Sequence, residues 1–187
     1  MTLGKSLHDD DIALKTGFIQ VLPIKDKKGR AVALVTPRNL ESSKYTRESM
    51  VRVTWYMIHT MLEDESAQQK GIIFIIDLSG AKVKHFDIPL VNQCSESVKG
   101  ILPLRISALH FCQPPILFDI LYEVVKLLLG ERLRKRIIVH SQWWVKEDDS
   151  NTLGAYGFTK SELPAGLGGD LFLDHQSWLA NRKALEK

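Results

Sequence analysis

The polar residues best placed for chemistry lie at the ends of predicted strands. Asp77 ends a continuous apolar run and Ser79 follows it, where the site of a Rossmann-type or hydrolase-type enzyme would lie. His110 and His140 each end a predicted strand and could act as bases, although a hydrogen-bonded structural histidine is commoner there. The sequence has no GxSxG elbow and no GxGxxG turn, and neither cysteine is followed by the arginine that a cysteine phosphatase needs. An enzyme such as an esterase that uses Asp77, Ser79 or His140 is therefore the less favoured hypothesis.

The spacing of potential metal ligands does not favour a metal site or a cofactor. The six histidines are scattered without HxxxH or HxH spacing, and Cys94 and Cys112 form no CxxC pair. The glycine-rich segment at 163–169 lacks the Lys-Ser/Thr ending and the preceding strand of a P-loop, so a phosphate cradle is not favoured. We therefore expect no metal, no cofactor and no catalytic residue. The two cysteines are typical of free thiols in a reducing compartment, which indicates a cytoplasmic protein.

Length, composition and charge indicate a single domain that does not bind nucleic acid. The 187 residues, of which 44% are hydrophobic, are enough to bury a core, and this length favours one domain over two. The net charge is +3, and the run from Glu131 to Arg136 alone contributes about that much, so the remainder is close to neutral. The N-terminal segment resembles neither a signal peptide nor an anchor, and no run of about 18 apolar residues occurs.

The segment from Ile116 to Leu129 predicts an unusual helix, because apolar residues occupy all but a narrow stripe of its surface. At about 100° per residue, Asp119, Glu123 and Lys126 fall on one side, and the other positions are apolar. The segment rises about 20 Å, which is too short to cross a hydrocarbon core of roughly 30 Å. Two explanations are open: a helix buried between a sheet and other helices, or a helix that covers something apolar that is not protein. Gly130 is expected to end it, and the basic run that follows suits the C-terminal end of a helix.

Hydrophobic periodicity elsewhere predicts strands that alternate with helices. The run from Gly71 to Leu78 is continuous and rich in β-branched residues, which indicates a central strand covered on both faces. Residues 1–16 are polar and aperiodic, which predicts a mobile tail or a short helix. We therefore expect an α/β fold with a mixed or mostly parallel sheet. The other expected strands are 18–22, 31–36, 105–111 and 136–141, and the other helices are 46–64, 87–99 and one after Asp174, with 142–162 as loop plus a short helix.

Several segments, in this order along the chain, resemble the CRAL-TRIO lipid-binding domains. They are VLPIKDKKGR at 21–30, FIIDLSG at 74–80, LPLRISALHFCQPPILF at 102–118, the stretch 126–140 and the Leu-Pro to Gly-Gly segment at 163–169. The resemblance runs from about Gly17 to Trp178. It assigns residues 17–187 to the domain, after a tail of residues 1–16 and without the three-helix segment that normally precedes it. It implies a sheet floor and a helical wall around an apolar pocket, with residues 113–136 as a mobile gate.

The same resemblance assigns residues to a basic site and to the pocket. Basic positions that hold lipid phosphates or phosphoinositide head groups in relatives correspond to Arg105, Arg132 and Arg136. Leu104 and Ser107 stand where relatives carry an acidic and a basic residue, and these departures weaken the match to a specific inositol head group. The pocket is expected to be apolar apart from one soft thiol. Its expected residues are Cys94, Val98, Leu102, Ile106 and Leu109 and, from the gate, Phe118, Leu121 and Val125.

The expected function follows from these implications. The domain binds one hydrophobic lipid, transfers it between membranes by displacing the gate helix, touches anionic membranes reversibly and catalyses no bond chemistry. An isoprenoid or sterol-like molecule, or the acyl chains of a phospholipid, is favoured over a specifically recognised inositol lipid. The alternatives are a protein-interaction or phosphoinositide-sensing module on the same fold and, less favoured, an α/β esterase. Trp143 and Trp144 lie in an apparent insertion, where packing and contact with a membrane interface are both open.

Overall fold

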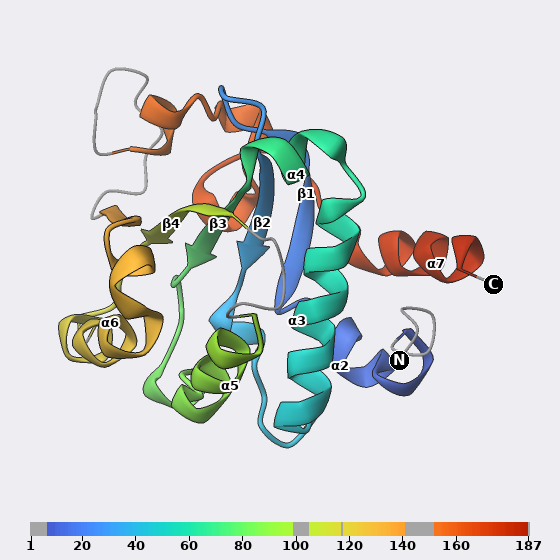
Figure 1. Ribbon diagram of the computed structural model, residues 1–187, viewed down its shortest axis with the longest axis horizontal. Coiled ribbons are helices and arrows are strands. Elements are labelled where there is room, and N and C mark those ends of the chain that lie inside the picture. Colours follow the sequence, from blue (N-terminus) through green and yellow to red (C-terminus); the bar gives the residue numbers. More distant parts are fainter. Residues whose placement is uncertain (1–6, 99–104, 117, 141–151, 187) are drawn as a thin grey trace.

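The computed structural model shows a five-stranded sheet with helices packed on one face (Figure 1). It describes residues 7–98, 105–116, 118–140 and 152–186. The strands are β1 (Ile19–Lys25), β2 (Ala31–Val35), β3 (Ile72–Asp77), β4 (Ile106–Cys112) and β5 (Ile137–His140), and they lie across the sheet in this same order. β1 runs antiparallel to β2 and the other neighbouring pairs are parallel, which confirms the expected α/β fold with a mixed, mostly parallel sheet.

The central strand β3 is buried along its whole length, as its continuous apolar run predicts. Successive side chains of a strand point to opposite faces of the sheet. Phe74 and Ile76 accordingly join the core on the helical face, whereas Ile73 and Ile75 join a second core on the other face. Because both faces of β3 are covered by protein, every residue of the strand has to be apolar until Asp77 ends it.

The helical face of the sheet is covered by helices that lie before, between and after the strands. The described helices are α2 (Asp11–Lys15), α3 (Arg47–Leu62), α4 (Glu65–Lys70), α5 (Ile88–Val98), α6 (Phe118–Arg134) and α7 (His175–Leu185). A capping box starts α3: the Thr46 hydroxyl accepts from the Ser49 N–H, and the Ser49 hydroxyl accepts from the Thr46 N–H. None of the helices in the described ranges combines the length and apolarity needed to span a membrane.

The opposite face of the sheet is covered by an irregular segment, residues 152–173. It contains the 3-10 turns η3 (Leu153–Tyr156), η4 (Lys160–Glu162) and η5 (Ala165–Leu167), and its apolar side chains pack on the second core. A Cβ atom at Gly169 would lie 1.8 Å from the Leu163 carbonyl oxygen, so only glycine permits this close approach of the chain to itself. Close packing therefore accounts for the glycines at 163–169, which are irregular as expected.

One short helix, α4, was not among the expected elements, and another, α2, was expected as one of two alternatives. α4 lies between the expected helix at 46–64 and the expected strand from Gly71, and the Asp64 carboxylate caps it by accepting from the Ser66 N–H at 2.8 Å. Residues 11–15 adopt the short-helix alternative as α2, in which Ala13 and Leu14 are buried. Six residues are too few for a clear hydrophobic period, so α4 is recognisable only from its cap.

Candidate functional site

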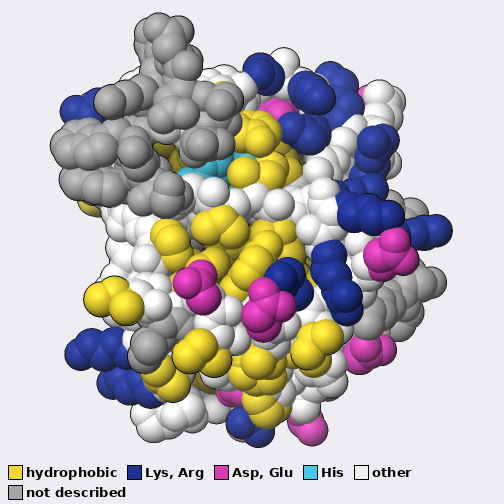
Figure 2. Space-filling view, turned by 90° about the vertical axis from the view of Figure 1, so that its left-hand side faces the viewer, with side chains coloured by type: hydrophobic (Ala, Val, Ile, Leu, Met, Phe, Trp, Pro, Cys, Tyr) yellow, Lys and Arg dark blue, Asp and Glu magenta, His cyan; other side chains and the backbone are white. Residues whose placement is uncertain are grey.

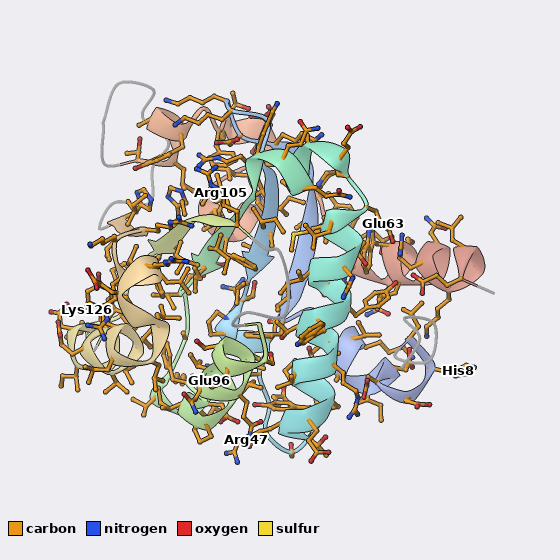
Figure 3. The ribbon with its side chains drawn as sticks, viewed as in Figure 1. His8, Arg47, Glu63, Glu96, Arg105 and Lys126 are labelled. Atoms are coloured by element: carbon orange, nitrogen blue, oxygen red, sulfur yellow. The ribbon has the colours of Figure 1, made fainter. Side chains whose placement is uncertain are left out.

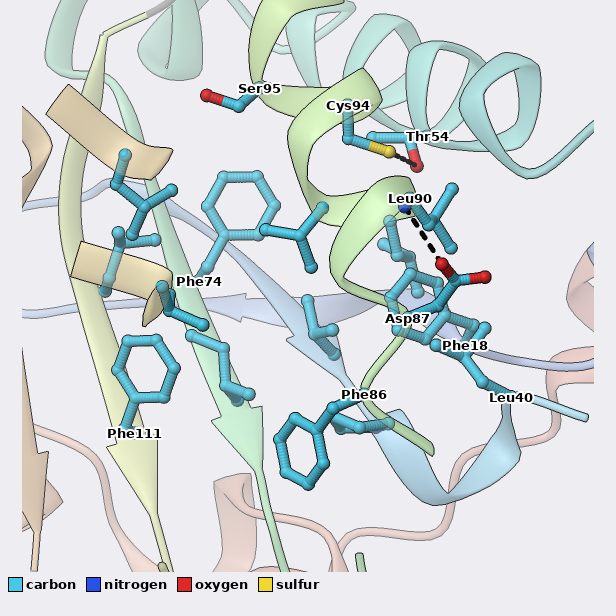
Figure 4. Close-up of a pocket in the computed structure, with 18 of the residues that line it drawn as sticks. Phe18, Leu40, Thr54, Phe74, Phe86, Asp87, Leu90, Cys94, Ser95 and Phe111 are labelled. Carbon is cyan, nitrogen blue, oxygen red and sulfur yellow. Dashed lines mark hydrogen bonds between the residues drawn. The ribbon is translucent and has the colours of Figure 1, made fainter. Parts of the chain in front are cut away.

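A cavity of about 230 Å³ lies between the helical face of the sheet and helices α3, α5 and α6. Side chains of β3 and β4 form its floor, and Figure 4 shows Phe74 and Phe111 there, opposite Leu90 and Cys94 of α5. Nearly all the side chains that line the cavity are apolar. An apolar cavity of this kind suits a nonpolar molecule, because its walls supply dispersion contacts and few hydrogen bonds.

Six of the eight residues expected in the pocket line this cavity. They are Cys94 from α5, Ile106 and Leu109 from β4, and Phe118, Leu121 and Val125 from α6. Leu102 lies outside the described residues, as does the side chain of Val98. The structure thus brings the described members of the set together, and their contact with a ligand stays a prediction.

Other wall residues come from loops to which the sequence assigned no role in a site. Phe18 precedes β1, Leu40 follows the 3-10 turn η1 (Pro37–Asn39), and Phe86 follows the 3-10 turn η2 (Val83–His85). Each is a large apolar residue in a short connection beside a buried strand or helix. That signal marks them as buried, but only the three-dimensional order of the strands places all three at one cavity.

Helix α6 covers the cavity and is anchored at its start by aromatic contacts. The ring of Phe118 stacks on Tyr122 with centroids 5.3 Å apart, and Phe111 of β4 lies 5.6 Å from Phe118 and 6.2 Å from Tyr122. The Lys126 ammonium lies 4.7 Å from the centroid of the Tyr122 ring. Only Phe118 is buried among the described residues of α6, so the explanation of α6 as a buried core helix is wrong.

Both ends of the α6 segment carry unusual backbone conformations. Gly130 interrupts the helix with φ 69° and ψ 163°, which confirms that the regular helix ends there, although the chain continues helically to Arg134. The Arg134 guanidinium donates to the Lys126 carbonyl oxygen at 2.5 Å and so caps the first part of the helix. Before the helix, Gln113 has φ 56°, and its side-chain amide donates to the Gly166 carbonyl oxygen at 2.8 Å.

The outer face of α6 exposes large apolar side chains to solvent. Ile116 is 98% exposed just before the helix, and Ile120 and Leu127 are 70% and 71% exposed within it. Figure 2 views the side of the molecule on which α6 lies and shows hydrophobic side chains gathered there among a few charged ones. The helix is therefore apolar toward the cavity and also apolar toward solvent, with its narrow polar stripe between the two faces.

The expected basic residues gather near the edge of the sheet where the parallel strands begin. Arg105 immediately precedes β4 and is exposed, and Figure 3 labels it at that end of the strand. Arg136 immediately precedes the neighbouring strand β5, and its guanidinium donates to the Ile106 carbonyl oxygen of β4. Arg132 is exposed in the last turn of α6, one helical turn before Arg136. Arg105 and Arg136 therefore lie just before the starts of two adjacent strands, and both lie outside the cavity.

The polar residues at the strand ends make structural contacts. Arg38 donates to the Asp77 carboxylate at 2.8 Å and also to the Ser79 hydroxyl oxygen. His110 Nδ1 and His140 Nε2 lie 2.8 Å apart and are buried, so each histidine is the partner of the other. No histidine contacts Ser79 in the described part of the chain, so the nucleophile and base of an esterase are not brought together. The described residues also contain no group of three or more potential metal ligands.

These observations define the class of protein: an α/β binding domain with an apolar cavity between its sheet and a covering helix. Comparison with known protein families identifies the family to which this domain belongs. A model of the CRAL/TRIO domain matches residues 15–169, and the chain belongs to this family. It is therefore a CRAL/TRIO lipid-binding domain, as the resemblance of its motifs implies.

Individual relatives agree with the family assignment. The chain is 29% identical over 171 residues to the human alpha-tocopherol transfer protein-like, covering 89% of the chain and 48% of that protein. It is 31% identical over 131 residues to mouse clavesin-2, covering 68% and 40% respectively. It is 24% identical over 163 residues to the human tyrosine-protein phosphatase non-receptor type 9, covering 87% of the chain and 26% of the phosphatase. The chain therefore spans half the length or less of these relatives.

A solved structure supports the fold independently of sequence. The crystal structure of Sfh5 superimposes with a TM-score of 0.59, covering the whole chain and 71% of Sfh5. The two sequences are 15% identical, so this likeness concerns the fold alone.

Proposed function

We propose that this domain binds one hydrophobic lipid in its cavity and transfers it between membranes. The observation that carries the proposal is the apolar cavity between the sheet and helices α3, α5 and α6. No lysine or arginine lines it among the described residues, so a phosphate would have no cation to pair with there. An isoprenoid, a sterol or an acyl chain is therefore favoured inside the cavity over an inositol head group. One relative's name refers to the transfer of alpha-tocopherol, which is compatible with this ligand class.

Displacement of α6 is the proposed route by which the lipid enters and leaves. A ligand covered by α6 leaves most easily if this helix moves, and of the three helices that line the cavity α6 has the fewest buried residues among those described. Gly130 interrupts the helix, and a Cβ atom there would meet nothing within 4 Å, so the chain is not tightly held at this point. Gln113 to Pro115 form the second proposed hinge. The exposed Ile120 and Leu127 would enter the apolar boundary of a bilayer when the protein docks.

A basic edge, defined by Lys70, Arg105, Arg132 and Arg136, is proposed to attract anionic membranes. The Lys70 ammonium lies beside Gly29, where an added Cβ atom would be 2.8 Å from it. Gly71, the residue after Lys70, lies beside Arg105, because a Cβ atom at Gly71 would be 3.2 Å from the Arg105 Cβ. Lys70 and Arg105 therefore stand on neighbouring segments of the backbone. None of the four forms an ion pair with an acidic side chain in the described ranges. Each basic residue near an anionic surface contributes about 1 kcal/mol, and the attraction is lost beyond about 8 Å at 0.15 M salt.

We propose no bond chemistry for this domain, and we propose that it is a cytoplasmic protein that associates reversibly with membranes. Ser79 accepts a hydrogen bond from Arg38, which withdraws electron density from the oxygen and does not activate it as a nucleophile. A broad ester-hydrolysis screen should return nothing above background. Hydrolysis that is abolished by Ser79→Ala would establish the esterase alternative instead.

Native mass spectrometry of the protein after incubation with lipid vesicles tests the proposed function. We expect one hydrophobic molecule bound per chain. The variant Leu121→Trp places a larger side chain on the cavity side of α6 and should lower the bound fraction at least tenfold. Its matched control is Ile120→Trp on the outer face of the same helix, which should leave the bound fraction unchanged.

Two results would contradict the proposed function. The first is the absence of any bound lipid after exposure to vesicles of mixed composition. The second is equal loss of lipid in Leu121→Trp and Ile120→Trp while both variants keep the melting temperature of the parent protein, because a cavity ligand should distinguish the two faces of α6.

A further inference from the structure

Near the middle of α5, three polar side chains line the cavity, whose walls are mostly apolar. They are Thr54 of α3 and Cys94 and Ser95 of α5. Figure 4 shows Cys94 and Thr54 pointing toward each other, with Ser95 on another side of α5. Thr54 and Ser95 are buried and Cys94 is half-buried, so a ligand that fills the cavity would remove all three from water. What each group can still donate or accept then decides which ligand fits.

The hydrogens of these three groups are already directed at protein acceptors. The Thr54 hydroxyl donates to the Met50 carbonyl oxygen at 2.9 Å, and the Ser95 hydroxyl points at the Leu128 carbonyl oxygen at 3.4 Å. Cys94 Sγ lies 3.5 Å from Thr54 Oγ1, and since the hydroxyl hydrogen is used on Met50, the thiol hydrogen points at Thr54. Burial raises the pKa of the Cys94 thiol, so the hydrogen stays on sulfur. The Thr54 and Cys94 pair thus offers lone pairs to the cavity and no free hydrogen.

We infer that Thr54 and Cys94 form a subsite for the hydroxyl group of a lipid alcohol. A ligand hydroxyl can donate to the Cys94 sulfur or to the remaining lone pair of Thr54, whereas an aldehyde, a ketone or a carboxylate has no hydrogen to give. A carbonyl oxygen buried beside this pair would be left without a partner. The inference deepens the proposed function, on which it rests, by naming the ligand class: an isoprenoid or sterol-type alcohol.

The other polar residues of the cavity lie near the first turn of α5. The Asp87 carboxylate accepts from Arg47 and from the Leu90 N–H, so it is already paired. His85 Nδ1 accepts from the Lys82 N–H, which leaves the hydrogen of the neutral ring on Nε2. His85 is therefore the described cavity residue that could donate to a carbonyl. His85 precedes α5, which begins at Ile88. Cys94 lies six residues after Ile88, about 9 Å along the helix at about 1.5 Å per residue.

Competition for a bound fluorescent fatty acid, with the chain as it stands, tests the inference. The competitors are farnesol, farnesal and farnesoic acid, which share one hydrocarbon chain and differ only in the terminal group. We expect farnesol to displace the probe at about tenfold lower concentration than the other two, since an unpaired buried acceptor costs about a factor of ten or more in affinity. The double variant Thr54→Val/Cys94→Ala should lose this preference. Thr54→Ser, which keeps the hydroxyl, and Ser95→Ala should both retain it.

The outcomes separate the inference from the proposed function. If the fatty-acid probe does not bind, the proposed function fails together with the inference; if the probe binds and farnesol does not displace it, only the inference is wrong. If all three displace it equally well, the domain is a lipid binder and the hydroxyl subsite is wrong. A preference for farnesal or farnesoic acid that disappears in His85→Leu would also overturn the inference. Should the double variant fail to fold, Cys94→Ala alone decides, and it should lower the alcohol preference without changing the melting temperature of the protein.

Discussion

The buried histidine pair predicts that this domain loses stability in mild acid. His110 is 0% exposed, and its Nδ1 lies 2.8 Å from His140 Nε2. Its other nitrogen, Nε2, has no hydrogen-bond partner among the described residues, which a lone pair tolerates better than an N–H, so the hydrogen belongs on Nδ1. Burial, and secondarily the charge that His140 can carry, lowers the pKa of His110 to about 3. A proton on His110 would be a buried charge beside a second imidazole.

The sign and size of the effect follow from the difference between the folded and unfolded pKa. The folded pKa of His110 is depressed below the unfolded value of about 6.5, so its contribution to stability is full above pH 6.5 and is lost as the pH falls toward 3. Proton linkage gives a loss of about 2 kcal/mol between pH 7 and pH 5 and about 3 kcal/mol between pH 7 and pH 4. Against a total stability of roughly 5 to 15 kcal/mol, this loss is large.

Urea unfolding followed by tryptophan fluorescence at pH 7, 6, 5 and 4 measures the effect. The variant His110→Asn keeps an N–H near the position of Nδ1, so it can still donate to His140, but it does not titrate. The variant should be less stable than the parent at pH 7, because its smaller side chain leaves a gap. Between pH 7 and pH 4, however, its free energy of unfolding should fall by about 2 to 3 kcal/mol less than that of the parent. The matched control His8→Asn changes an exposed histidine and should follow the parent at every pH.

Comparing the stability of the parent and of His110→Asn across this pH range tests whether His110 causes the acid sensitivity. If both lose stability in parallel as the pH falls, the acid sensitivity comes from elsewhere, and the buried neutral state of His110 is not its cause. The lowered pKa of His175, which burial produces, adds a loss of the same sign in both proteins and therefore cancels in the comparison.

Three further predictions concern α6 and the basic edge. Amides of residues 118–129 should exchange with deuterium faster than those of β3, and faster again with vesicles present; uniform protection of both segments would indicate a static helix. Gly130→Ala should destabilise the closed position by about 1 to 3 kcal/mol, because φ 69° with ψ 163° suits only glycine, and faster exchange confined to α6 would show it. Arg132→Glu/Arg136→Glu should reduce cosedimentation with anionic vesicles about tenfold or more at low salt; unchanged binding, or equal binding of the parent to neutral vesicles, would exclude the electrostatic contact.

Local patterns were sufficient for the elements whose neighbours in space are also neighbours in sequence. The continuous apolar run of β3, the helix that begins after Thr46 and the interruption at Gly130 are each determined within a few residues, and all three predictions are confirmed. The cavity is different, because Phe18 and Leu40 reach it only once β1 and β2 pair. Loop residues of this kind carry no period, so the sequence indicates their burial without indicating what they face.

The histidine pair shows the same limit at a single contact. His110 and His140 were each predicted to be a structural histidine at a strand end, and the structure confirms that they are hydrogen-bonded. That they bond to each other depends on the register in which Cys112 faces His140 across β4 and β5. A shift by one residue would turn one ring to the other face of the sheet. Register is set by long-range packing, which short motifs do not encode.

The proposed displacement of α6 accounts for the composition of this helix, because the helix would then work in two surroundings. A helix that permanently covered a core would gain stability from polar residues on its outer face, since exposed Ile120 and Leu127 bury nothing there and promote association with other apolar surfaces. A helix that lay permanently in a membrane would not need Phe118 and Tyr122 packed against Phe111. An apolar surface on both sides is stable in each position: the inner face packs on the cavity when the domain is in water, and the outer face is buried when it docks. The proposal therefore expects a small energetic difference between the two positions, as a helix displaced by a passing lipid requires.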